Sequence, residues 1–130
     1  MTTPYPFEIV IQSNRVLILH EVSSQVRRIW TDGRKHPDDL DPTYMGHSIG
    51  HWEGDTLVVD TVGMRGDTVF DVTAAPHSDK IHVTERIRRL TPAKLEDRFE
   101  VEDQVAFTRP WQVVRTLRPE TRLADHRIRL

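Results

Sequence analysis

The stretch GHSIGHWEGDTLVVDTVG, residues 46–63, predicts the class of fold that this chain adopts. Glu53, Gly54 and Asp55 are the residue types of a tight turn, and the run from Thr56 to Val62 is rich in β-branched residues, which suit a pleated, half-buried surface. We therefore expect a β-hairpin. The stretch also holds two of the seven histidines, a tryptophan and three acidic residues, so we expect a functional site near it.

Short β-rich runs flank this hairpin on both sides. The N-terminal side predicts a meander of three strands, and the C-terminal side predicts a hairpin and a last strand; the runs are Phe7–Gln12, Arg15–Val22, Gln25–Thr31, Lys80–Leu90, Leu95–Asp103 and Trp111–Arg118. No apolar period of 3.6 residues persists for three turns, so helices are not expected. The chain is predicted to be a single all-β, antiparallel domain over residues 1–130.

The sequential hairpins favour a meander that closes into a calycin-like or lipocalin-like up-and-down barrel, because closure removes exposed strand edges. A β-sandwich or jelly roll is the alternative. Residues 34–45 contain two prolines and three aspartates and predict an ordered loop of a length typical of functional lids. Residues 69–72 fit a short strand or a helical turn, and the tail from Pro119 to Leu130 fits a ninth strand or a short helix.

The hairpin at residues 80–103 predicts which side chains face inward. Because side chains alternate along a strand, one face is mostly apolar and consists of Val83, Glu85, Ile87, Phe99 and Val101. The opposite face is charged, with His82, Thr84, Arg86 and Arg88 opposing Glu96, Arg98, Glu100 and Glu102. Glu85 is therefore a carboxylate on an otherwise apolar face.

Composition excludes several classes of function. The chain has no cysteine, which excludes disulfides, thiolate catalysis and cysteine-based zinc sites. A formal net charge of -2, with arginines interleaved among acids, argues against nucleic acid as a partner. No apolar run is long enough to cross a membrane, and the first residues lack the basic and apolar regions of a secretory signal, so a cytoplasmic location is predicted.

Metal and cofactor sites are not predicted. His47 and His51 are four residues apart and would be separated by roughly 13 Å along an extended strand. The sequence contains no nucleotide-binding fingerprint and no nucleophile elbow. The expected site therefore uses protein side chains alone.

Acid–base chemistry in a barrel cavity is the main functional hypothesis. Burial would raise the pKa of Glu85, and a cation such as Arg115 would lower it. His47 and His77 could supply a second titrating group, and Asp60 a second inward carboxylate. Such a site suits an isomerase, cyclase, dehydratase or lyase acting on a small hydrophobic molecule without a cofactor. The competing interpretation is that Glu85 and Arg115 form a purely structural buried pair.

Binding without catalysis is the second hypothesis. The aromatic and basic side chains that could line a ligand pocket are Tyr44, Trp52, Phe99, Trp111 and Arg115. In that case the barrel would hold a small hydrophobic molecule. A self-assembling structural module, such as a homodimer, is the remaining alternative.

Four motifs carry a resemblance to a known group of proteins: WEGDTLVVDT at residues 52–61, PHS at 76–78, HVTERIRR at 82–89 and FTRPW at 107–111. Together they resemble a broad group of uncharacterised bacterial proteins, many of them exported. The likeness extends over residues 4–116 and implies no particular activity. It implies export for members with a leader, whereas the first residues of this chain predict the cytoplasm.

Overall fold

The computed structural model describes residues 7–21, 24–67 and 76–118 and contains eight β-strands in one sheet. The strands are β1 (Phe7–Ile11), β2 (Arg15–His20), β3 (Gln25–Trp30), β4 (His47–Glu53), β5 (Thr56–Val62), β6 (His82–Thr91), β7 (Lys94–Glu102) and β8 (Trp111–Leu117). The described residues include no helix, and so none that could span a membrane. The all-β prediction is confirmed, while residues 69–72 and 119–130 lie outside the described part.

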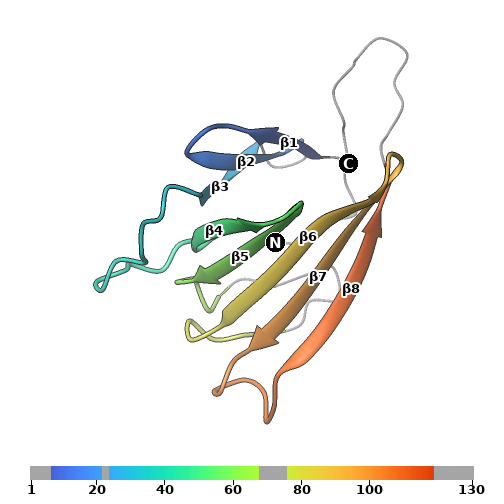
Figure 1. Ribbon diagram of the computed structural model, residues 1–130. Coiled ribbons are helices and arrows are strands. Elements are labelled where there is room, and N and C mark those ends of the chain that lie inside the picture. The colour runs from blue at the N-terminus through green and yellow to red at the C-terminus, as the bar shows by residue number, and fades with distance from the viewer. Residues whose placement is uncertain (1–6, 22–23, 68–75, 119–130) are drawn as a thin grey trace.

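The strands follow one another across the sheet in chain order, which is the order of an up-and-down barrel. The sheet curls into a half-barrel, and β1 and β8, the first and last strands described, are not paired with each other (Figure 1). All eight strands belong to this one sheet rather than to the two sheets of a sandwich.

The step from β3 to β4 is parallel, which corrects the prediction of a wholly antiparallel sheet. Only two residue pairs, Ile29 with Ser48 and Trp30 with Ile49, form this ladder. Parallel neighbours need a long crossover, and the connection over residues 31–46 carries the chain back to the starting edge. The backbone pairing of the sheet is therefore weakest between β3 and β4.

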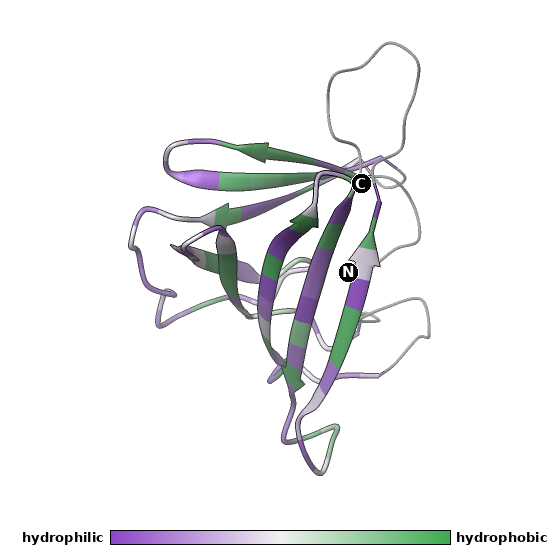
Figure 2. Cartoon of the chain, turned by 45° about the vertical axis from the view of Figure 1, so that its right-hand side comes forward, coloured by the Kyte–Doolittle hydropathy of each residue, from purple (hydrophilic) through white to green (hydrophobic). Residues whose placement is uncertain are grey.

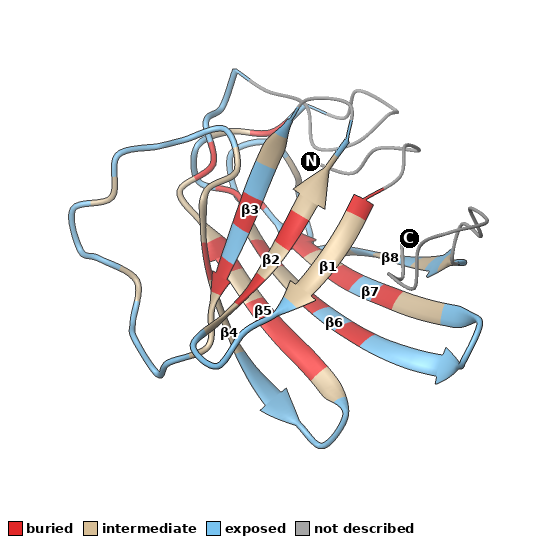
Figure 3. Ribbon diagram, turned by 90° about the horizontal axis from the view of Figure 1, so that it is seen from above, coloured by how far each residue is buried: buried red, intermediate tan, exposed pale blue. Residues whose placement is uncertain are grey.

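Side-chain alternation on β6 and β7 agrees with the sequence prediction. Val83 pairs with Val101 and Glu85 with Phe99 on the buried face, and Arg88 pairs with Glu96 on the exposed face. Buried and exposed residues alternate along β3 and the first half of β6 (Figure 3). Figure 2 shows that hydrophobic and hydrophilic residues are mixed within the strands of the sheet. The inner face of the half-barrel thus forms the core.

The core consists of two apolar clusters on this inner face. The first apolar cluster contains Phe7, Val16, Ile18, Ile29, Leu57, Val59 and Ile87. The second apolar cluster contains Met64, Ile81, Val83, Phe99 and Val101. Because the first cluster joins β1 and β2 to β5 and β6, it holds the two sides of the curled sheet together across the interior (Figure 3).

The loop over residues 34–45 is fixed to the rest of the domain. The Thr43 amide donates to the Gly63 carbonyl at 2.9 Å, and the Arg65 amide donates to the Thr43 carbonyl at 2.8 Å. At the start of the loop, the Arg34 guanidinium lies 3.7 Å from the centre of the Trp30 ring. These contacts anchor the loop beside the end of β5.

The closeness of this packing can be tested at two glycines with positive φ. Gly46 has φ +68°, and an added Cβ would lie 2.6 Å from the Val62 carbonyl oxygen, whereas Gly54 has φ +63° and open space around it. Both alanine substitutions place a side chain in a left-handed conformation, at a cost of about 1–2 kcal/mol. We expect Gly46→Ala to lower the free energy of unfolding by about 1–3 kcal/mol more than Gly54→Ala, because only Gly46→Ala also creates a clash. Urea denaturation measures both, and equal losses would contradict the close approach at Gly46.

Candidate functional site

The two apolar clusters are separated by a layer of polar side chains across the inner face. On β6 the order is Val83, Glu85, Ile87, so a carboxylate stands between a member of each cluster. On β7, Asp97 stands between Leu95, beside the first cluster, and Phe99 of the second. We call this set the polar layer; its members are Arg27, Ser48, Thr61, Glu85, Asp97 and Arg115.

Arg27 is the centre of the polar layer, and each nitrogen of its guanidinium group has a hydrogen-bond partner. Its Nη1 donates to Glu85 Oε1 at 3.1 Å, and its Nη2 forms a salt bridge with Glu85 Oε2. The same Nη2 donates to Thr61 Oγ1 at 2.8 Å, and Nε donates to Ser48 Oγ at 3.3 Å. One side chain from β3 thereby contacts β4, β5 and β6.

The ion pair neutralises the charge of Arg27 in the protein interior. Burial by itself lowers the pKa of an arginine, but the charge and hydrogen bonds of Glu85 outweigh that effect and raise the pKa of Arg27. Both side chains are about 95% buried. Arg27 is therefore a permanent cation neutralised by Glu85.

A second ion pair in the polar layer joins β7 to β8. Arg115 Nη2 donates to Asp97 Oδ2 at 2.9 Å, and these two residues are direct cross-strand neighbours. Burial, followed by the negative charge of Glu85, raises the pKa of Asp97 to about 6 against the opposing effect of Arg115. Asp97 is thus a buried carboxylate that titrates near neutral pH.

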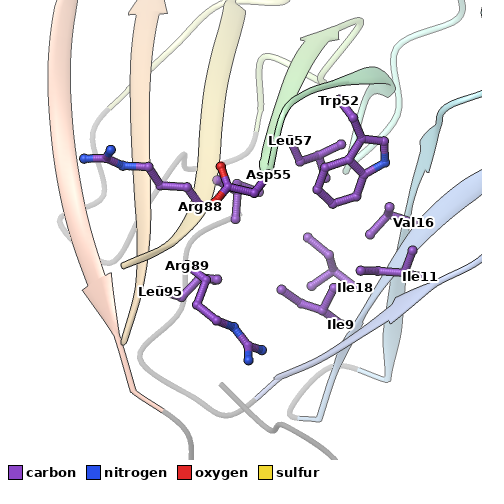
Figure 4. Close-up of a pocket in the computed structure, with 11 residues that line it drawn as sticks. Ile9, Ile11, Val16, Ile18, Trp52, Asp55, Leu57, Arg88, Arg89 and Leu95 are labelled. Carbon is purple, nitrogen blue, oxygen red and sulfur yellow. The ribbon is translucent and has the colours of Figure 1, made fainter. Parts of the chain in front are cut away.

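An apolar cavity of about 360 Å³ lies on the first-cluster side of the polar layer. Figure 4 shows its lining residues around an open space, with Trp52, Asp55, Arg88 and Arg89 at the rim. The apolar walls come from β1, β2, β5, β6 and β7: Ile9, Ile11, Val16, Ile18, Leu57, Ile87 and Leu95. Ile11, Asp55 and Arg89 adjoin three different hairpin turns, so the cavity opens where these turns meet. No residue of the loop over 34–45 lines this cavity.

The predicted catalytic residues do not converge. Glu85 lies in the polar layer as expected, but its cation is Arg27 rather than Arg115. His77 is buried elsewhere, and its Nδ1 lies 2.9 Å from the Ser78 carbonyl oxygen, in a segment held by Asp103.

Asp60 and His47 lie on the outer face of the sheet, so the prediction that Asp60 points inward is wrong. Asp60 pairs with Thr84, whereas Val59 pairs with Glu85, which places Asp60 on the opposite face from Glu85. The reason is that β5 is buried on both faces, since Val58 is nearly as inaccessible as Val59. The apolar residues beside Asp60 on β5 therefore did not show that Asp60 faces the interior.

These outer-face residues form two hydrogen-bonded pairs. His36 Nδ1 lies 2.7 Å from His47 Nδ1, and His82 Nε2 lies 2.5 Å from Asp60 Oδ1. Burial, then the charges of His36 and Arg34, lower the pKa of His47. The first pair joins the loop over residues 34–45 to β4, and the second joins β5 to β6; His36 Nε2 lies 3.7 Å from Asp60 Oδ1, between the two pairs. Within residues 7–21, 24–67 and 76–118, no three His, Asp or Glu side chains are arranged to hold a metal ion.

The predicted ligand-lining residues divide into three locations. Trp52 lines the cavity, and Arg115 lies in the polar layer at its base. Tyr44 lies in a separate groove between β3 and β4, with Trp30 and His47. Phe99 and Trp111 belong to or pack against the second apolar cluster and are core residues.

Two charged members of the polar layer were missed by sequence reasoning, although the sequence contains a signal for each. Arg27 alternates with Ile29, and Asp97 alternates with Leu95 and Phe99, so each shares a face with apolar residues just as Glu85 does. Strand parity applied equally to all strands would have identified both. The partner of each charge could not be found in the same way.

No protein-family model, curated protein or solved structure matches the chain. The resemblance to exported bacterial proteins, the cellular compartment and self-assembly accordingly stay predictions. The site is interpreted below from its own geometry.

The buried ion pair makes a clear prediction about stability. Glu85→Gln leaves the Arg27 cation uncompensated in the interior, and we expect the free energy of unfolding to fall by about 3–5 kcal/mol. Replacing both partners, as Arg27→Met with Glu85→Leu, removes the charge altogether and should recover most of that loss. The matched control is Glu53→Gln, which breaks a half-exposed pair with Arg86 and should lower the free energy of unfolding far less, because solvent screens an exposed pair. Equal losses for Glu85→Gln and Glu53→Gln in urea denaturation would show that the buried pair is not essential.

The raised pKa of Asp97 predicts a dependence of stability on pH. The unfolded carboxyl group titrates near ~3.9 and the folded one at about 6, so between these values the folded state binds the extra proton. The contribution of Asp97 to the free energy of unfolding is therefore greatest below pH ~4 and is lost as the pH rises through about 6, by up to about 3 kcal/mol.

Asp97→Asn removes this titration and retains the shape of the side chain. We expect the stability difference, wild type minus variant, to decrease between pH ~4 and ~7 in urea denaturation, because the other carboxyl groups titrate in both proteins. A difference that stays constant or increases with pH would contradict the assignment.

Proposed function

We propose that this protein binds a small apolar molecule in the cavity of its half-barrel. The observation that carries the proposal is the cavity itself, which is of ligand size at about 360 Å³ and has seven apolar lining side chains. Well-packed cores contain few voids larger than a water molecule, so a space of this size is a feature that needs an occupant.

The rim of the cavity supports the same proposal. Ile11 and Trp52 are large apolar residues that stay 64% and 46% exposed, and both stand at the opening. Arg89, which has the same strand parity as Glu85 and Ile87, adds a long aliphatic stem ending in a cation. An apolar entrance with a charged edge suits the capture of a water-insoluble molecule.

Acid–base catalysis on such a molecule is a second proposal, and the observation that favours it is Asp97. Glu85 is saturated by Arg27, whereas Asp97 titrates near neutral pH and lies beside the cavity. If the protein is an enzyme, Asp97 is its acid or base. Turnover that survives Asp97→Asn would exclude this role for Asp97.

Binding is tested with isotope-labelled isoleucine methyl groups and 1-methoxyoctane as an apolar probe. We expect NMR shifts at Ile9, Ile11, Ile18 and Ile87, which line the cavity, because the probe displaces solvent from their methyl groups. Ile81, buried in the second apolar cluster, serves as an internal control and should not shift.

Two tryptophan substitutions separate cavity binding from adsorption to the surface. Ile9→Trp should fill the cavity and abolish the shifts at the remaining isoleucines, whereas Val114→Trp, on the exposed face of β8, should leave them intact. Shifts that survive Ile9→Trp, or that are absent from the parent protein, would contradict the proposed function.

A further inference from the structure

A second, much smaller pocket lies at the base of the apolar cavity. Its volume is about 20 Å³, enough for one water-sized group. It shares four lining residues with the large cavity, Ile9, Ile18, Ile87 and Leu95, so the two spaces adjoin. The rest of its wall is formed by Phe7, His20, Leu117 and four charged members of the polar layer.

Three buried polar atoms with no hydrogen-bond partner among the described residues belong to the wall of this small pocket. They are His20 Nε2, Asp97 Oδ1 and Arg115 Nε. Buried polar groups are almost always paired, and an unpaired one costs free energy. The contrast with Arg27, bonded to Ser48, Thr61 and Glu85 a short distance away, shows that the polar layer is satisfied on one side only.

The chemistry of the three atoms defines what would pair with them. Asp97 forms an ion pair with Arg115, and the Oδ1 atom of an ionised carboxylate can only accept. Arg115 Nε–H can only donate. Burial, with the charges of Arg27 and Arg115, lowers the pKa of His20, so its neutral ring donates or accepts according to tautomer. The pocket therefore suits one group that both donates and accepts.

We infer that this small pocket receives the hydroxyl group of an apolar ligand whose body fills the cavity, with Asp97 Oδ1 accepting from the hydroxyl and Arg115 Nε donating to it. The inference rests on the proposed function and names the class of molecule bound, an aliphatic or alicyclic alcohol. His20 Nε2 supplies a third hydrogen bond.

Charged head groups fit the pocket less well. Arg27, Glu85, Asp97 and Arg115 sum to zero net charge, so neither an anion nor a cation finds a compensating excess. A carboxylate has no proton to give Asp97 Oδ1, and an ammonium has no lone pair for Arg115 Nε. A primary amide has both functions, but a volume of about 20 Å³ accommodates a single heavy atom more readily.

The experiment compares octan-1-ol with 1-methoxyoctane. The ether has the same alkyl chain and an oxygen that accepts hydrogen bonds, but it has no O–H group to donate one. Dissociation constants come from titrations followed at the isoleucine methyl groups of the full chain. We expect octan-1-ol to bind about tenfold or more tightly than the ether, because the ether leaves Asp97 Oδ1 unpaired in a dry site.

A paired substitution keeps the test independent of folding. Asp97→Leu with Arg115→Met removes the ion pair as a unit, which buried pairs tolerate far better than loss of one partner. In this variant we expect 1-methoxyoctane still to shift the isoleucine methyl groups, which reports an open cavity, and the preference for octan-1-ol over the ether to disappear. Asp67→Leu with Arg65→Met removes an exposed ion pair away from the cavity and should keep the full preference.

The possible failures are distinguishable. Binding of neither probe to the parent protein would refute the proposed function. Equal binding of both probes to the parent protein would overturn only the alcohol inference and would indicate that the small pocket is a water site. A preference for octan-1-ol that persists after Asp97→Leu with Arg115→Met would place the hydroxyl elsewhere and overturn the inference as well.

Discussion

The ion pair between Arg27 and Glu85 is the interaction on which the arrangement of this sheet depends. The backbone ladder between β3 and β4 has only two residue pairs, so it holds β1 to β3 weakly against the rest of the sheet. Arg27 starts on β3 and reaches Ser48, Thr61 and Glu85 on the next three strands. The Arg27 side chain thus joins the strands at the place where the backbone ladder has the fewest residue pairs. The desolvation cost of a buried charge is offset only if the charged group is paired and hydrogen-bonded. Arg27 meets this condition, because each nitrogen of its guanidinium group has a partner.

This constraint also divides the interior. Two guanidinium groups and two carboxylates at one level prevent the two apolar clusters from merging, because each charged group must keep its polar partners. The second cluster is closed by Met64, Ile81 and aromatic neighbours, whereas the first lies against strands β1 and β2 and leaves a cavity. The position of the cavity therefore follows from the level of the polar layer along the barrel axis. On the second-cluster side of the polar layer the side chains fill the interior. On the first-cluster side, core residues such as Val16 and Ile18 also line the cavity.

Much of this fold could be predicted from alternation along single strands. Seven of the eight strands were identified to within two residues at each end, and side-chain parity alone placed Glu85 and Phe99 on the same inner face. Parity failed for Asp60, because β5 is apolar on both faces. It also could not choose partners across the barrel, which depend on how the strands curl rather than on their residues.

The incorrect pairing of Glu85 with Arg115 illustrates that limit. The two residues lie on β6 and β8, which are two strands apart. Because neighbouring strands are spaced about 4.8 Å, Arg115 pairs with an acid on the strand between them. That acid is Asp97, directly opposite Arg115 on β7. Registering β7 against β8 would have found this pair, because cross-strand neighbours are the closest contacts in a sheet. Finding Arg27 opposite Glu85 required the three-dimensional curl, since the sequence places them 58 residues apart.

The two ion pairs of the polar layer differ in a way that bears on function. Each nitrogen of the Arg27 guanidinium has a hydrogen-bond partner among Glu85, Ser48 and Thr61, which is what a structural pair requires. Asp97 and Arg115 share one bond at 2.9 Å and each keep a buried atom unpaired among the described residues, on the side that faces the cavity. Stability alone would favour an apolar pair there, since such exchanges are often neutral or stabilising. Sequences that specify a fold depart from such local preferences mainly at functional sites, and the unsatisfied half of the polar layer is where this chain departs.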